Sequence, residues 1–149
     1  MRKINLIVLH CSATRETMEY TPEQMERDHK ARGFFSAGYN YYIRRSGEVV
    51  PMRPPEQIPA HAKGYNAFSL GICYEGGLDA DGHPKDTRTE RQKLSIRGLL
   101  LLLLVRYPGC RICGHRDLSP DRNGDGKITW DEWLKECPCF DAEEEYGIL

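Results

Sequence analysis

The sequence has little that would place the protein in a membrane or on a nucleic acid. Its longest apolar run, Leu99 to Val105, is far shorter than the ~20 residues that a transmembrane helix needs. The net charge is only −1, and the basic residues form no stripe that would bind nucleic acid. The chain has 149 residues, 40% hydrophobic and 29% charged, which suits one globular domain. We expect a single domain over residues 1–149, monomeric, with neither membrane nor nucleic acid as a partner.

The N-terminus also lacks a clear export signal. Met1-Arg2-Lys3 precedes a short apolar stretch, but Asn5 interrupts it and no small-residue cleavage site follows cleanly. We interpret the stretch as a first strand. We therefore expect a protein that is made in the cytoplasm and reaches any extracellular substrate only after release by another route. Without a leader, the six cysteines are expected to serve as metal ligands or catalytic groups rather than as disulfides.

Several stretches have the pattern of β-strands. Apolar runs predict buried strands at residues 4–10 and 69–74, and a further short strand is predicted at residues 111–114. A hairpin is predicted from residues 41–45 and 48–52, which flank a Ser-Gly pair typical of a two-residue turn. No internal repeat or low-complexity linker separates these stretches.

Two capping boxes predict helices between the strands. Thr21 and Thr89 are each followed three residues later by glutamine, and a proline follows Thr21 at the first helical position. The first helix is predicted to end near Gly33 and the second, longer one near Tyr107. Residues 54–66, with several prolines, are predicted to be a loop. The sequence therefore predicts an α/β fold with a mixed central sheet flanked by helices.

One candidate metal site combines residues from distant parts of the chain. His10 ends the first predicted strand and His115 follows the last one, so both could face a cleft at the strand ends. With Cys137 they would give Zn²⁺ three nitrogen or sulfur ligands and leave a fourth position open. The spacing alone is weak support, because three ligands spread over the chain match no local rule.

A closed four-cysteine zinc site is the competing interpretation. Cys110 and Cys113 form a C-x-x-C pair, and Cys137 and Cys139 form a C-x-C pair. On spacing alone this is the better motif. The plainer alternative is that Cys110 and Cys113 pack as small apolar side chains.

Five segments of the chain, in the same order, resemble a known family. They are Val8–Thr14, Gly38–Gly47, His61–Asn66 with the following 69–73, Gly114-His115 and Lys135–Pro138. The sequence resembles the phage lysozymes that are N-acetylmuramoyl-L-alanine amidases and, more distantly, the peptidoglycan recognition proteins. The matching segments extend over nearly the whole chain, which makes the resemblance specific.

The resemblance implies a site and an activity. It implies that His10, His115 and Cys137 bind zinc, and that Tyr39 and Lys135 are catalytic. The reaction would be zinc-dependent hydrolysis of the amide bond between the lactyl group of N-acetylmuramic acid and L-alanine, an endolysin-like degradation of the cell wall. Under this interpretation the four-cysteine site loses most of its support.

Other residues have softer assignments. By resemblance, His61 and Asn66 are expected to line the cleft and contact the peptidoglycan substrate. Glu75 is a competitor for the role of general base, which the sequence leaves unassigned. Asp117 either supports a ligand imidazole or caps a turn. Cys139 falls where the phage enzymes carry a serine and is expected to be a bystander.

The main alternative is a non-catalytic peptidoglycan-binding module of the same fold. Recognition proteins on this fold often lose the cysteine ligand. Here Cys137, Tyr39 and Lys135 are all present, which favours an enzyme.

A second metal motif departs from the family pattern. Residues 121–132 fit the twelve-residue EF-hand loop, with glycine at position six and glutamate at position twelve. The expected calcium ligands are the side chains of Asp121, Asn123, Asp125 and Glu132 and the backbone carbonyl of Lys127. A helix is predicted after the loop, over residues 129–136, whereas no entering helix is predicted. The alternative is a turn rich in Asx residues that binds no metal.

Overall fold

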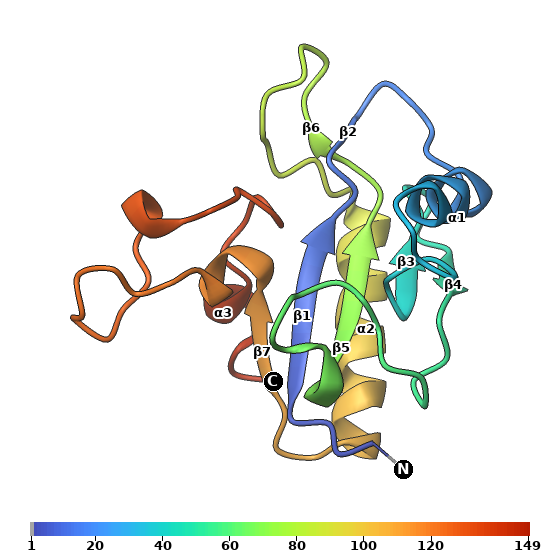
Figure 1. Ribbon diagram of the computed structural model, residues 1–149. Helices are drawn as coiled ribbons and strands as arrows, with labels where there is room; N and C mark the ends of the chain where they lie inside the picture. The colour runs from blue at the N-terminus through green and yellow to red at the C-terminus, as the bar shows by residue number, and fades with distance from the viewer. Residues whose placement is uncertain (1) are drawn as a thin grey trace.

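A five-stranded mixed sheet forms the centre of the computed structural model, which describes residues 2–149 (Figure 1). Its strands lie in the order β4-β3-β5-β1-β7. They are β1 (Leu6–Cys11), β3 (Tyr41–Ile43), β4 (Val49–Pro51), β5 (Ser69–Tyr74) and β7 (Arg111–Gly114). All neighbours are parallel except the β3–β4 hairpin. The predicted α/β class with a mixed sheet is therefore confirmed.

The two central strands, β1 and β5, are buried along their whole length, because both faces of the sheet are covered. Side chains alternate between the faces of a strand. Ile7 and Leu9 therefore pack into the cluster that contains α2 (Glu90–Arg106), the helix behind the sheet in Figure 1. Val8 packs on the opposite face, and His10 follows it there. The alternation of β1 thus determines that His10 faces away from α2.

Both predicted helices begin at their capping boxes. In α1 (Pro22–Ala31) and in α2, the threonine side chain accepts from the backbone N–H of the glutamine three residues later. The side-chain oxygen of this glutamine accepts in turn from the backbone N–H of the threonine. Among the strands, 69–74 and 111–114 have the predicted bounds. The first strand is shifted to residues 6–11. The hairpin strands are shorter than predicted, and residues 44–48 connect them.

Several short elements were not predicted. A separate two-stranded sheet pairs β2 (Thr14–Arg15) with β6 (Gly77–Leu78), and a short helix, α3 (Ala142–Tyr146), packs near the C-terminus. Single 3₁₀ turns occur at Asn66–Phe68, His115–Leu118 and Trp130–Glu132.

The helix predicted over residues 129–136 is wrong. Only the single turn Trp130–Glu132 forms there, and Trp133 already has an extended backbone. The chain cannot continue as a helix because the Leu134 N–H donates to the Ser119 side chain instead of a carbonyl one turn earlier. Pro138 also disfavours helical geometry at the residue before it.

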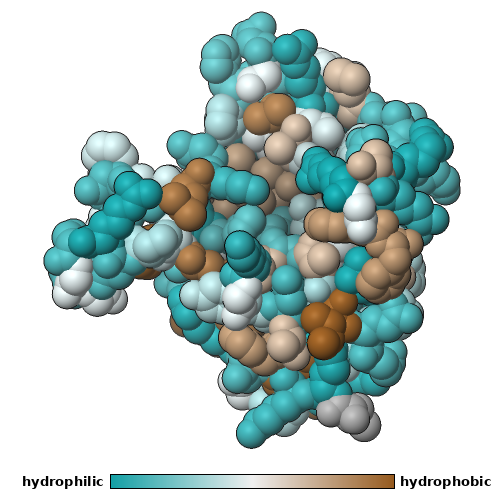
Figure 2. All heavy atoms as spheres, viewed as in Figure 1, coloured by the Kyte–Doolittle hydropathy of each residue, from teal (hydrophilic) through white to brown (hydrophobic). Residues whose placement is uncertain are grey.

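The segment between β7 and α3 extends outward from the body of the domain (Figure 1). Its visible surface is mostly hydrophilic (Figure 2). None of the helices in residues 2–149 combines the length and the apolar character that crossing a bilayer requires.

Candidate metal centre and active site

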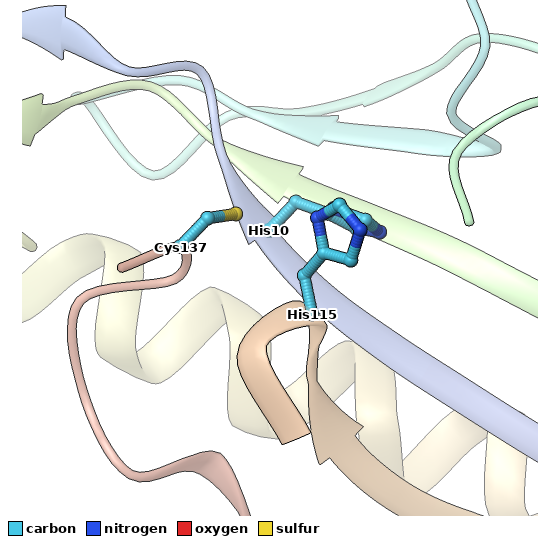
Figure 3. A group of neighbouring side chains, drawn as sticks. All are labelled: His10, His115 and Cys137. Atoms are coloured by element: carbon cyan, nitrogen blue, oxygen red, sulfur yellow. The ribbon is translucent and has the colours of Figure 1, made fainter. Parts of the chain in front are cut away.

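Three potential metal ligands meet at the carboxyl ends of the central strands (Figure 3). One ligand atom from each of His10, His115 and Cys137 lies within 4.8 Å of the other two. Parallel pairing explains the meeting of the two histidines. Leu9 on β1 pairs with Gly114 on β7, so the next residue of each strand comes to the same edge of the sheet. The two imidazole rings lie with their centroids 4.6 Å apart.

Long-range backbone contacts bring Cys137 to this edge. The Arg116 N–H donates to the Cys137 carbonyl at 2.9 Å, and the Cys11 N–H donates to the Cys137 sulfur at 3.1 Å. Gly114 allows the close approach, because a Cβ there would lie only 2.6 Å from Cδ of Pro138. These contacts hold the Cys137 sulfur beside the two histidines.

The four-cysteine alternative finds no support in the geometry. Cys113 is buried on β7, and the Cys110 thiol donates to the Ile4 carbonyl at 3.5 Å. No group of close metal-ligating side chains within residues 2–149 includes either of them. Both pack with apolar neighbours, as the plainer interpretation expected.

The imidazoles at this edge are held neutral. Burial is the main cause that lowers the pKa of His10 well below its ordinary value, and His61, His115 and Lys135 add to it. Burial and then Lys135 lower the pKa of His115 to about 4. Burial also lowers the pKa of His61 to about 3. Neutral imidazoles are the form that coordinates a metal.

A cleft of about 590 Å³ opens over the three ligands. All seven residues predicted for zinc binding, catalysis and substrate contact line it: His10, Tyr39, His61, Asn66, His115, Lys135 and Cys137. Two cations of its lining, Arg32 and Lys63, were not predicted as site residues. Arg32 lies outside every segment that resembles the family, and Lys63 lies in the His61–Asn66 segment without an assigned role. Among the described residues that line the cleft, none is acidic.

The two residues predicted to be catalytic both line the cleft. The Tyr39 ring lies 5.0 Å from the His10 ring, centroid to centroid. Burial is the main cause that raises the Tyr39 pKa well above its ordinary value, and the neighbouring cysteine side chains, Cys73 first, add to it; the hydroxyl therefore keeps its proton at neutral pH. Lys135 lines the cleft two residues before Cys137 and has an exposed side chain.

Asn66 and His61 are hydrogen-bonded within the protein. The Asn66 side-chain oxygen accepts from the backbone N–H groups of His61 and Ala62, at 2.9 and 3.0 Å. One ring nitrogen of His61 lies 2.7 Å from His10, and the other lies 2.9 Å from the Ser69 hydroxyl. These contacts hold the loop that forms one wall of the cleft.

Two other carboxylates have structural partners. Glu75 is buried outside the cleft lining, where it accepts from Arg44 and from the backbone N–H groups of Tyr20 and Arg45. This placement gives no support to Glu75 as a general base. Asp117 accepts from the backbone N–H of Gly114 at 2.7 Å, which is the turn-capping role.

The EF-hand-like loop brings three of its predicted ligands together. Carboxylate oxygens of Asp121, Asp125 and Glu132 lie within 4.8 Å of one another. Asp121, Asn123 and Asp125 accept from backbone N–H groups of the loop, and the buried Glu132 carboxylate closes it by accepting from both ends.

Comparison with known proteins gives one consistent family. A family model described as N-acetylmuramoyl-L-alanine amidase matches residues 1–132, so Lys135 and Cys137 lie beyond the matched range. The chain is 37% identical over 137 residues to an endolysin of Klebsiella phage KP32, covering 92% of this chain and 82% of the endolysin. It is 53% identical over 96 residues to an uncharacterized protein of Haemophilus influenzae, covering 64% of this chain and 83% of that protein.

Solved structures agree with these sequence matches. The chain is similar to the N-acetylmuramoyl-L-alanine amidase LysC from Clostridium intestinale, with a TM-score of 0.71 and 27% identity. The alignment covers 92% of this chain and 77% of that chain.

The buried imidazoles predict an acid-sensitive metal-free protein. Between the ordinary histidine pKa of ~6.5 and the value of about 4 for His115, the unfolded chain binds protons that the folded chain does not. The free energy of unfolding should therefore fall as the pH is lowered through this window. Urea denaturation at pH 7.5 and pH 5.0, with a chelator present, measures the fall. The fall should be smaller in His115→Asn; an equal fall would show that His115 does not contribute.

Proposed function

The chain belongs to the N-acetylmuramoyl-L-alanine amidase family, and from this premise we propose that it is a zinc-dependent hydrolase of peptidoglycan. The bond cut would be the amide between the lactyl group of N-acetylmuramic acid and L-alanine. One observation carries the proposal: His10, His115 and Cys137 converge at the base of a 590 Å³ cleft. The likeness to phage endolysins supports action on the cell wall after release from the cytoplasm.

The donor set fits Zn²⁺. Two imidazole nitrogens and one cysteine sulfur are ligand types that Zn²⁺ binds, and a catalytic zinc with three protein ligands leaves a fourth position for water or substrate. When bound, Zn²⁺ would supply a Lewis acid that polarises the scissile carbonyl and lowers the pKa of a water molecule to near ~7. The N–H of Cys11 lies 3.1 Å from the Cys137 sulfur and helps to hold this donor in place.

Lys135 and Tyr39 are the proposed catalytic residues. The Lys135 ammonium is close enough to lower the pKa of both ligand histidines, so it can also stabilise negative charge that develops on the substrate carbonyl oxygen. A preorganised donor of this kind contributes about 3 kcal/mol to lowering the barrier. Because the Tyr39 phenol keeps its proton, it acts as a hydrogen-bond donor in the cleft rather than as a base.

The charge of the cleft favours an anionic substrate. Arg32, Lys63 and Lys135 line it, and no carboxylate does among the described lining residues. A pocket lined by one sign of charge concentrates ligands of the opposite sign. Stem peptides of peptidoglycan carry free carboxylates, which suits this lining. We also propose that His61 and Asn66 contact the muropeptide, because both line the same cleft.

The first prediction joins metal content to the reaction. Purified protein should carry about one zinc per chain and release free stem peptide from purified muropeptides, as seen by mass spectrometry. Cys137→Ala should lose both the zinc and the activity, because it removes a ligand. Cys110→Ala is the matched control and should keep both. Zinc-loaded protein that binds muropeptides without cutting them would instead be the non-catalytic module.

A second prediction separates chemistry from binding. Lys135→Ala should keep zinc and lower kcat by about 100-fold, since it removes charge stabilisation that matters mainly in the transition state. Tyr39→Phe should also keep zinc and lose turnover. Lys63→Ala, which removes another cation of the cleft, should raise KM more than it lowers kcat. An unchanged kcat in Lys135→Ala would remove Lys135 from the mechanism.

We propose in addition that residues 121–132 bind Ca²⁺. The support is the EF-hand spacing together with the close approach of Asp121, Asp125 and Glu132. Asn123 and the carbonyl of Lys127 complete the proposed ligand set. The loop lies between the ligands His115 and Cys137, so an ion there would order the segment that leads to Lys135.

Calcium binding can be tested with one pair of variants. Titration calorimetry on the wild type should detect Ca²⁺, and a hundredfold excess over Kd should stabilise the fold by ~2.7 kcal/mol. Glu132→Gln should weaken binding and keep zinc, because it removes the bidentate carboxylate. Asp131→Asn makes the same charge change at a position that is no EF-hand ligand, and should bind as wild type does. If the titration of the wild type shows no heat of binding at millimolar Ca²⁺, the proposed calcium site is wrong.

A further inference from the structure

The His61 imidazole has contacts that a substrate-binding residue does not need. Its Nδ1 lies 2.7 Å from Nε2 of His10, and its Nε2 lies 2.9 Å from the Ser69 hydroxyl. Within residues 2–149, no other side chain lies within hydrogen-bonding distance of the His10 ring. His61 is not one of the three clustered ligands. Two nitrogen ligands of a tetrahedral zinc lie about 3.3 Å apart, so the 2.7 Å contact is a hydrogen bond and not a shared metal.

This hydrogen bond determines which nitrogen of His10 is free. A neutral imidazole has one N–H and one acceptor nitrogen, and only the acceptor nitrogen can coordinate a metal. Because Nε2 of His10 is occupied by His61, Nδ1 is the nitrogen left for the metal. With a metal on Nδ1 of His10, the proton of this ring is on Nε2. His10 Nε2–H then donates to His61 Nδ1, and His61 Nε2–H donates to the Ser69 oxygen.

We propose that His61 is a positioning residue that holds His10 in the Nε2–H tautomer, with Nδ1 directed to the metal. The proposal rests on the proposed function, since it assumes that His10 is a zinc ligand. It assigns His61 a task beyond contact with the muropeptide. Hydrogen-bonded partners of this kind fix both the orientation of a ligand imidazole and its tautomer.

The surroundings of His61 are built to keep the ring in this place. Asn66 holds the backbone N–H groups of His61 and Ala62. Gly71, in the middle of the buried strand β5, leaves the space that the ring fills; a Cβ there would lie 2.7 Å from Cγ of His61. Ser69, which accepts at the far end, is fully buried at the start of the same strand. Backbone hydrogen bonds, side-chain packing and the contact with Ser69 therefore all hold the His61 ring in the same position.

Two substitutions of similar chemistry separate the two ring nitrogens. The side-chain amide of His61→Asn ends near the position of Nδ1, so its oxygen can still accept from His10. The amide of His61→Gln ends near the position of Nε2, so it can reach Ser69 but leaves His10 without its partner. Zinc affinity is measured by competition with a chromophoric chelator, on protein whose thermal unfolding confirms the fold.

We expect His61→Gln to bind zinc 10- to 100-fold more weakly than wild type, the usual effect of losing such a partner. His61→Asn should stay within a few-fold of wild type. Ser69→Ala should lower the zinc affinity slightly, because it removes the partner at the far end of the His61 ring. It replaces a His61 variant in the test if that variant fails to fold. Long-range ¹H–¹⁵N spectra of the metal-free protein should show the His10 ring protonated on Nε2.

Wild-type zinc affinity in both His61→Gln and Ser69→Ala, or a His10 ring protonated on Nδ1, would overturn the positioning role. Retained zinc affinity with a raised KM for muropeptide would make His61 a substrate contact only. Failure of the proposed function would look different. The wild type would then bind zinc but release no peptide, while the difference in zinc affinity between the two variants would remain.

Discussion

The parallel pairing of β1 between β5 and β7 is the constraint on which the candidate site depends. It brings the carboxyl ends of three buried strands to one edge of the sheet. It also places His10 and His115 next to each other, although more than one hundred residues separate them in the chain. The alternation of side chains along β1 then puts His10 on the face away from α2, where a cleft can open. A one-residue slip of β1 would turn His10 into the core.

The same burial that builds the sheet prepares the ligands chemically. Removing the histidines from water keeps them uncharged, and it keeps the Tyr39 phenol protonated. Arg32, Lys63 and Lys135 make the cleft electrically positive, because no carboxylate is present among its described lining residues. The electrostatic character of the cleft therefore follows from the fold, because the groups that carry it come from separate elements.

The projecting segment between β7 and α3 is closed at its base by two hydrogen bonds. The Arg116 N–H donates to the Cys137 carbonyl, and the Leu134 N–H donates to the Ser119 side chain. These contacts hold the two ends of the segment together where they meet the domain. Residues 121–132 can therefore carry a structure of their own without displacing Cys137. This arrangement explains how a loop of different chemistry can lie between two candidate ligands.

The sequence by itself determined the parts of this protein that depend on local interactions. The capping boxes at Thr21 and Thr89 predicted both helix starts, since each box involves residues only three apart. The apolar run at 69–74 predicted a buried strand with its observed bounds. The segments that resemble the family contain all seven predicted site residues that line the cleft.

Only the tertiary structure decided the features that depend on contacts between residues far apart in the chain. The spacing of the cysteines favoured a four-cysteine site, but β7 buries Cys113 among apolar neighbours. The stretch at 129–136 has a helical pattern, but its Leu134 N–H donates to Ser119. The contact of His61 with His10 joins residues 51 apart in the chain. Contacts of this kind produce no local sequence pattern, because the residues come within reach of each other only after the strands have paired.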